Sequence, residues 1–222
     1  MARKFWIIWD WNGTLIDDVD ISLECINTIL KKSRLPTIDR DNYQEIFTFP
    51  VKDYYKKLGF DFTRNSFTEL ADMFIDEYKK RMFNAKLFPD VRNVLEFLQQ
   101  MGAKQFVISA MEIRKLRQAI ENKGILHYFE AILGLGNDYA KGKLDLIKKF
   151  AADWKSQLNS KKIWMIGDTV HDFYIADELK WNSILVSQGH YSFSRLNAVG
   201  KRVVRNLDGV LNIFKNQMDK PA

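Results

Sequence analysis

Short apolar runs alternate with segments of helical periodicity along most of this chain. The runs lie at 5–9, 105–109, 131–133, 163–166 and 183–186. Between them, apolar residues recur every three or four positions at 91–101, 113–120, 144–158 and 170–179. Near-continuous apolar runs of this length are typical of strands that are buried on both faces of a parallel sheet. The alternation therefore predicts right-handed βαβ units and a doubly wound α/β core.

One segment, residues 16–88, interrupts this alternation. It contains no convincing strand, and its apolar residues form helical stripes at 21–30 and 67–82 with shorter helical pieces at 43–47 and 51–58. An all-helical insert directly after the first strand predicts a cap domain at 16–88, beside a core domain formed by 1–15 and 89–222. The aromatic residues of the second stripe, Phe67, Phe74 and Tyr78, are expected in the hydrophobic core of this cap.

Composition limits the class of protein and its partners. The 222 residues are 46% hydrophobic and 28% charged, and no apolar run is long enough for a membrane span, so we expect no membrane partner. The net charge is +6, but the basic residues are scattered, and we therefore expect no nucleic-acid partner. A single cysteine, Cys25, excludes an internal disulfide and favours a cytoplasmic location. A monomer and a homodimer are both compatible with the sequence.

Polar residues follow the predicted strands in a pattern suited to phosphoryl transfer. Ligands of open parallel sheets bind outside the carboxyl ends of the strands. The residues expected there are Asp10 and Thr14 after the first strand, Ser109 after the second, Lys141 and Lys143 in a later loop, and Asp168 and Asp172 after the fourth. A carboxylate can act as nucleophile, and hard oxygen ligands suit Mg²⁺. A lysine and a hydroxyl can stabilise the charge of a transferring phosphoryl group.

These four elements resemble the haloacid dehalogenase (HAD) superfamily, in the order which that family uses. Residues 10–15, with the sequence Asp-Trp-Asn-Gly-Thr-Leu, are similar to its nucleophile motif. Ser109, Lys143 and the pair Asp168 and Asp172 are similar to its later motifs. The helical insert, with its segment 49–55, resembles the cap of the phosphoglycolate-phosphatase-like branch. The resemblance covers nearly the whole chain and implies a Rossmann-like core and a Mg²⁺-dependent phosphatase.

The resemblance also implies a role for each residue. Asp10 is the expected nucleophile and a Mg²⁺ ligand, with Asp168 and the backbone carbonyl of Asn12 as further ligands. Ser109 and Thr14 are expected to contact phosphate oxygens. Lys143, preferred to Lys141 for its better match to the family motif, is expected to stabilise the phosphate. Asp172 is expected to orient either Lys143 or a metal-bound water. The implied substrate is a small phosphorylated metabolite, similar to phosphoglycolate or a sugar phosphate, and Phe47, Phe49, Pro50 and Lys52 are candidates for the cap surface that contacts it.

Asn12 departs from the family pattern. Phosphatases of this family usually carry a second aspartate there, which protonates the leaving oxygen and then activates water. A carboxamide can hydrogen-bond but has no proton to transfer at neutral pH. Asn12 is either natural, with another group such as His190 substituting, or an introduced change. Two alternatives therefore stay open: a dehalogenase that needs no Mg²⁺, and a pseudo-phosphatase that binds phosphate without turnover. The carboxylates of Asp168 and Asp172 argue against the dehalogenase, because they require a cation to offset them.

Overall fold

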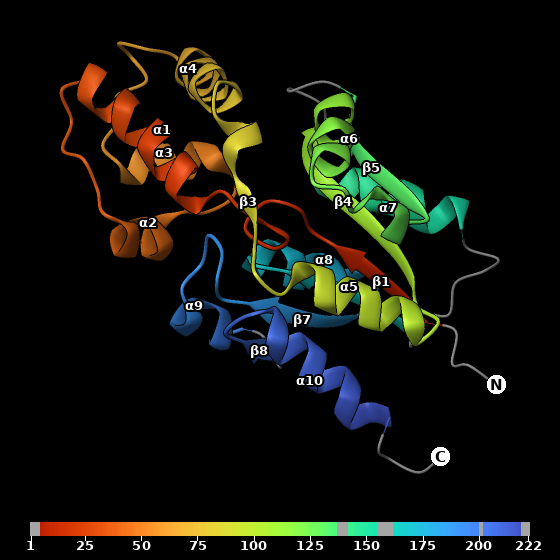
Figure 1. Ribbon diagram of the computed structural model, residues 1–222. Coiled ribbons are helices and arrows are strands. Elements are labelled where there is room, and N and C mark those ends of the chain that lie inside the picture. The colour runs from red at the N-terminus through yellow and green to blue at the C-terminus, as the bar shows by residue number, and fades with distance from the viewer. Residues whose placement is uncertain (1–4, 137–141, 155–161, 200–201, 219–222) are drawn as a thin grey trace.

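A computed structural model describes residues 5–136, 142–154, 162–199 and 202–218. A six-stranded parallel sheet forms its core (Figure 1). The strands are β1 (Trp6–Trp9), β4 (Lys104–Glu112), β5 (Ala131–Leu135), β6 (Ile163–Gly167), β7 (Asn182–Val186) and β8 (Val203–Val204). Their spatial order is β5-β4-β1-β6-β7-β8, so the chain builds outward from β1 first to one side and then to the other. The predicted doubly wound α/β class is confirmed.

Helices cover both faces of this sheet. Helices α5 (Val91–Gln100), α6 (Ile113–Asn122) and α10 (Leu207–Met218) pack on one face, and α7 (Lys143–Asp153) and α8 (Val170–Glu178) on the other. In β1, Ile7 and Trp9 belong to the first of these two hydrophobic layers, whereas Trp6 and Ile8 belong to the second. Every residue of β1 is consequently buried, which explains why its sequence is a continuous apolar run.

Four helices form a separate layer beside one end of the sheet (Figure 1). They are α1 (Val19–Lys32), α2 (Arg40–Ile46), α3 (Val51–Lys57) and α4 (Phe67–Lys79). Their own hydrophobic core includes Ile26, Tyr55 and Leu70. Ser66 and Glu69 form a capping box that fixes the start of α4. We refer to these four helices, with the segments that join them, as the cap.

The structure corrects the sequence prediction at several places. The expectation of no strand within 16–88 is wrong at both ends, where β2 (Ile16–Asp17) and β3 (Lys86–Leu87) pair antiparallel between the cap and the core. Two-residue strands are too short to produce a detectable period. The elements that the sequence did not predict are β8, α9 (Phe193–Asn197), α10 and the 3₁₀ turns η1 (Met82–Asn84) and η2 (Leu126–Tyr128). The helix predicted over 144–158 ends at Asp153, and 155–161 lie outside the described residues. In the described residues, no helix has the length and apolar character that a membrane crossing requires.

Candidate active site

Asp10 and Asp168 lie at the ends of two neighbouring strands in the middle of the sheet. The amide of Asp10 donates to the Ile166 carbonyl oxygen at 2.9 Å, so the pairing of β1 with β6 continues to the first site residue. The chain builds to opposite sides of the sheet from these two strands, which makes their carboxyl ends the topological switch point of the fold. Both carboxylates are buried. The sheet itself therefore brings two acidic side chains together.

The turn after Asp10 depends on Gly13. Its φ of 68° lies in the left-handed region, and a Cβ atom there would stand 2.2 Å from Oδ2 of Asp168. The next residue, Thr14, is fully buried, and its hydroxyl donates to Oδ1 of Asp168 at 3.0 Å. The Thr14 hydroxyl is thus engaged by Asp168, and the expected contact of the Thr14 region with phosphate stays a prediction. Thr14 lies behind Asp168 and orients that carboxylate.

Lys143, the first residue of α7, joins two of the acidic side chains. Its Nζ donates to Oδ1 of Asp10 at 2.5 Å and to Oδ1 of Asp172 at 2.6 Å. The other oxygen of Asp172 accepts from the amide and the hydroxyl of Thr169 at 3.1 and 2.8 Å, which caps the start of α8. Asp172 therefore holds Lys143 through one oxygen and a helix terminus through the other. Lys141, the other lysine considered, lies outside the described residues.

The acidic cluster carries more negative charge than its lysine offsets. Ligand oxygens of Asp10, Asp168 and Asp172 all lie within 4.8 Å of one another. Burial raises the pKa of Asp10 to about 8, against the lowering effect of Lys143, and the neighbouring carboxylates raise it further. Burial likewise raises the pKa of Asp168 to about 6. Buried, hard oxygen donors with unbalanced charge fit a divalent cation such as Mg²⁺.

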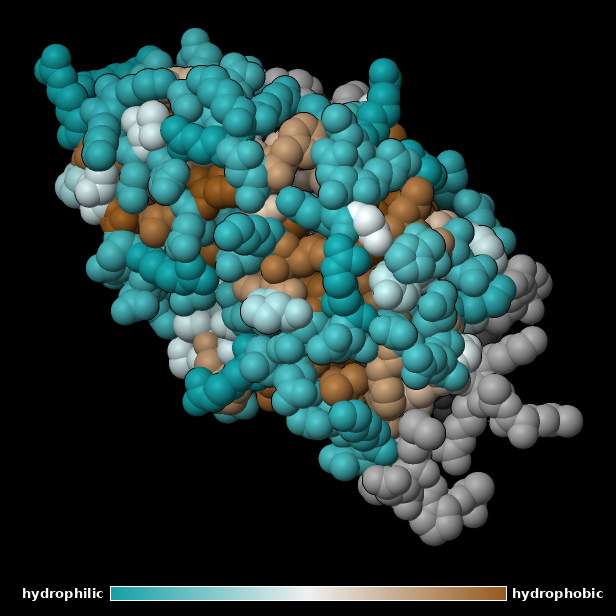
Figure 2. Space-filling model, in the orientation of Figure 1, coloured by the Kyte–Doolittle hydropathy of each residue, from teal (hydrophilic) through white to brown (hydrophobic). Residues whose placement is uncertain are grey.

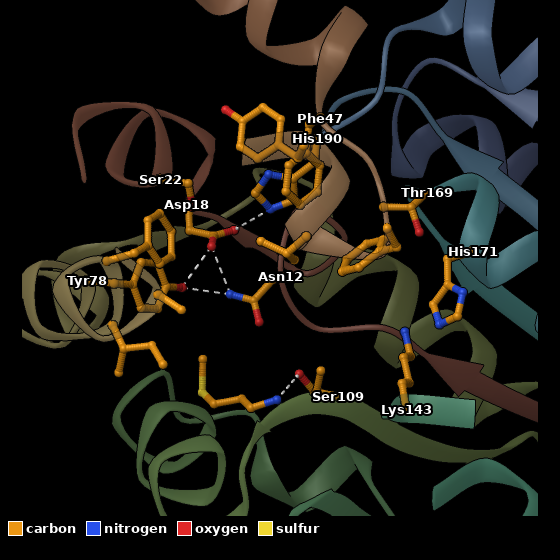
Figure 3. Close-up of a pocket in the computed structure, with 18 of the residues that line it drawn as sticks. Asn12, Asp18, Ser22, Phe47, Tyr78, Ser109, Lys143, Thr169, His171 and His190 are labelled. Carbon is orange, nitrogen blue, oxygen red and sulfur yellow. Dashed lines mark hydrogen bonds and ion pairs between the residues drawn. The ribbon is translucent and has the colours of Figure 1, made fainter. Parts of the chain in front are cut away.

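A cavity of about 660 Å³ lies between this cluster and the cap. Ser109 lies in its wall, and the Ser109 hydroxyl oxygen accepts from the amide of Met111 at 3.1 Å, which leaves the hydroxyl proton to donate. The pairing of β4 with β5 is irregular between Ile108 and Glu112, and this irregularity shapes the strand around Ser109. Figure 3 shows Ser109 and Lys143 on one side of the cavity and Asn12, Asp18 and Tyr78 on another.

The side chain of Asn12 is fixed by two residues that the sequence did not indicate. Its Nδ2 donates to Oδ2 of Asp18 at 2.8 Å and to the Tyr78 hydroxyl at 2.7 Å. The Tyr78 hydroxyl in turn donates to the same Asp18 oxygen at 2.7 Å. The expectation that Tyr78 belongs to the cap core is thus wrong, whereas Phe67 and Phe74 pack against that core as expected and also line the cavity. A stripe of aromatic residues on a helix gives no sign of whether it faces a core or a cavity.

His190 connects the acidic cluster to the cap. Its backbone amide donates to Oδ2 of Asp168 at 2.6 Å, its Nδ1 lies 2.8 Å from the Tyr43 hydroxyl, and its Nε2 lies 3.4 Å from Oδ1 of Asp18. Burial lowers the pKa of His190, but the Asp18 carboxylate outweighs it, and the pKa is raised to about 9. Both ring nitrogens are engaged by Asp18 and Tyr43, so neither is directed at Asp10.

The described residues thus define a doubly wound α/β protein with a helical cap and a buried carboxylate–lysine site at the switch point. The family model for haloacid dehalogenase-like hydrolases matches residues 7–186, and the chain belongs to that family.

Curated relatives are distant. The chain is 21% identical to a phosphoglycolate phosphatase of Vibrio parahaemolyticus, over 83% of this chain and 84% of that protein. It is 21% identical to a probable phosphatase, IndB, of Dickeya dadantii, over 89% of this chain and 87% of the relative. A phosphoglycolate phosphatase of Aliivibrio fischeri is 26% identical over 47% of this chain, a match that spans 45% of that protein's length.

Solved structures share the fold. A haloacid dehalogenase-like hydrolase of Streptococcus pneumoniae has a TM-score of 0.79 and 22% identity, covering 96% of this chain and 100% of the other. A predicted phosphatase of Clostridium acetobutylicum has a TM-score of 0.79 and 23% identity over the same shares of the two chains. At these identities, the similarity establishes the arrangement of core and cap and not the substrate.

Proposed function

We propose that the protein is a Mg²⁺-dependent phosphatase that cleaves a small phosphomonoester through an aspartyl-phosphate on Asp10. The observation that supports this proposal is the contact of Lys143 with Asp10 and Asp172, beside Asp168, in the wall of a cavity that cap residues also line. The names of the relatives, which are phosphatases, support the same reaction class.

Each residue has a role in this proposal. Asp10, Asp168 and the Asn12 carbonyl oxygen would hold Mg²⁺, which supplies charge neutralisation for the phosphate. Lys143 contacts Oδ1 of Asp10, so we assign the attack on phosphorus to Oδ2. Formation of the bond between Oδ2 and phosphorus breaks the bond to the leaving oxygen. Water then attacks phosphorus, releases inorganic phosphate and restores the carboxylate. Ser109 and Lys143 would stabilise the phosphoryl oxygens during both steps.

Asn12 limits proton transfer in both steps of this reaction. Because Nδ2 faces the acceptor Asp18, the oxygen of the carboxamide is the atom that points into the cavity (Figure 3). An amide oxygen accepts hydrogen bonds only, so it can position a water molecule but cannot protonate a leaving oxygen. The same feature favours the alternative of a phosphate-binding protein with little turnover, and the experiment below separates the two.

The test combines metal removal with detection of the phosphoenzyme. We expect hydrolysis of acetyl phosphate and nitrophenyl phosphate to disappear in EDTA and to return with Mg²⁺. Intact-mass measurement after brief exposure should show one phosphoryl group on the protein and none on Asp10→Asn, whose amide is not a nucleophile. Full release of halide from a haloacid in EDTA, without added Mg²⁺, would support a dehalogenase. Binding of inorganic phosphate with Mg²⁺, but without turnover of acetyl phosphate or nitrophenyl phosphate, would support a pseudo-phosphatase.

A further inference from the structure

The cavity above the acidic cluster has two unlike walls. The core contributes the charged and polar groups described above. The cap contributes mainly aromatic and aliphatic side chains, among them Phe47, Phe49, Val51, Phe67, Phe74 and Ile75. Away from this cavity, Tyr174 is the one large hydrophobic side chain that is exposed among the described residues, and the face in Figure 2 is mostly hydrophilic. The concentration of apolar surface around this cavity is therefore a local feature.

The charged groups in the cavity wall outside the phosphoryl centre are of both signs. In the described part of the cap, Lys79 is the one cationic side chain that lines the cavity. Lys115 lines it from α6, but two carboxylates, Asp18 and Glu112, also lie in the wall outside the phosphoryl centre. Lys52, a sequence candidate for substrate contact, is exposed and lies 5.7 Å from the ring centre of Phe62. His190 lies in the same wall and pairs with Asp18, so these charges do not select for or against a carboxylate on the leaving group.

The aromatic side chains of the cap wall pack against one another and against the core. The rings of Phe74 and Tyr78 are stacked at 5.9 Å, and Phe47 and Phe49 meet edge to face at 5.3 Å. Phe49 also lies 5.3 Å from the His171 ring, so it bridges the cap and the core. Aromatic rings that are held in this way present flat apolar surfaces to a ligand, with a preference for offset or edge-on contact.

We infer that the substrate is a phosphomonoester whose leaving group is an aromatic or bulky apolar alcohol, and not phosphoglycolate. This inference rests on the proposed phosphatase function and adds the substrate class. The phosphate would bind at Asp10, Lys143 and Ser109, and the apolar group would lie against Phe47 and Phe74. A cavity of about 660 Å³ is within the range of pockets for small organic ligands, whereas phosphoglycolate, among the smallest phosphomonoesters, would leave most of this apolar wall without contact.

The test compares three alkyl esters with Mg²⁺ present: phenylethyl phosphate, ethyl phosphate and phosphoglycolate. All three have an alkoxide leaving group, so Asn12 affects them alike. Burial of the phenyl ring should raise kcat/KM for phenylethyl phosphate roughly 10- to 100-fold above ethyl phosphate. The phosphonate isosteres, in which CH₂ replaces the bridging oxygen, cannot be hydrolysed. Their affinities, measured by calorimetry with Mg²⁺, should follow the same order.

The variants Phe74→Ala and Phe74→Leu shorten the apolar wall, and Phe62→Ala is the matched control because Phe62 does not line the cavity. Both Phe74 variants should reduce the preference for the phenyl ring, by roughly tenfold in Phe74→Ala, while Phe62→Ala should not change it. Equal affinity for the phenyl and ethyl phosphonates, or tighter binding of the phosphoglycolate isostere, would overturn the inference. Selective binding of the phenyl phosphonate without hydrolysis of any ester would refute the phosphatase function alone.

Discussion

Nδ2 of Asn12 donates a hydrogen bond of 2.8 Å to Oδ2 of Asp18, the residue that immediately precedes α1. Burial raises the pKa of Asp18, but His190, Tyr78 and Asn12 outweigh it, so the pKa is lowered and Asp18 is ionised at neutral pH. The carboxamide is therefore oriented by a buried charge. In this buried network, Asp18 accepts hydrogen bonds from neutral and cationic donors. An aspartate at position 12 would replace one of these donors with a second carboxyl group.

Restoring the family's aspartate should raise the rate with poor leaving groups. In Asn12→Asp, the new carboxyl lies beside Asp18, and repulsion raises its pKa so that it keeps a proton at neutral pH. Turnover of alkyl phosphates should increase roughly 100-fold, the usual size of an acid–base contribution. Nitrophenyl phosphate, whose leaving group needs little protonation, should gain much less. Steady-state kinetics on both esters measures the difference. Unchanged alkyl-phosphate turnover in a folded variant would mean that another group already transfers the proton.

Mg²⁺ binding should depend on pH. The metal must displace protons from Asp10 and Asp168, so affinity should rise between about pH 6 and pH 8, where burial places their pKa values. Calorimetry in two buffers with different ionisation enthalpies should detect proton release near neutral pH. Asp168→Asn is the control, and it should lose most of the binding while the protein remains folded. Affinity that is constant across this pH range would contradict the assignment of these carboxylates.

Because His190 forms an ion pair with Asp18, the free energy of unfolding should decrease as the pH becomes alkaline. The pKa of His190 is raised from 6.5 to about 9 in the folded protein. Its contribution is therefore fully present below about pH 6.5 and is lost as pH rises through about 9. Urea unfolding in EDTA should show that the stability difference between wild type and His190→Gln shrinks over this range. A difference that stays constant would mean that the histidine is not protonated in the folded state.

Two tyrosines of the cap offer a matched pair of substitutions. Among the described residues, the Tyr54 hydroxyl is buried without a hydrogen-bond partner, whereas the Tyr43 hydroxyl contacts Nδ1 of His190. Removing an unsatisfied buried hydroxyl should leave the free energy of unfolding unchanged or raise it by about 1 kcal/mol, so Tyr54→Phe should be at least as stable as wild type. Tyr43→Phe leaves the histidine nitrogen unpaired and should lose about 1 kcal/mol. Chemical denaturation of both variants tests this, and the reverse order would contradict the hydrogen-bonding pattern.

The sequence by itself determined the α/β core and the polar residues that follow its strands. Parallel strands bring their carboxyl ends to one edge of a sheet, so an apolar run followed by Asp10, and another followed by Asp168, predict two carboxylates at that edge. That β1 and β6 are adjacent comes from the tertiary structure. The order of strands and helices was readable for the same reason, because each strand buried on both faces is a continuous apolar run.

Only the tertiary structure decided what surrounds Asn12 and which side chains line the cavity. Tyr78 lies 66 positions from Asn12, and Tyr43 lies 147 positions from His190, so these contacts exist only after the cap has docked on the core. A helical stripe such as Phe67, Phe74 and Tyr78 has the same period whether it faces a hydrophobic core or a cavity. The periodicity reports the face of the helix, and the packing of the cap against the core decides what that face meets.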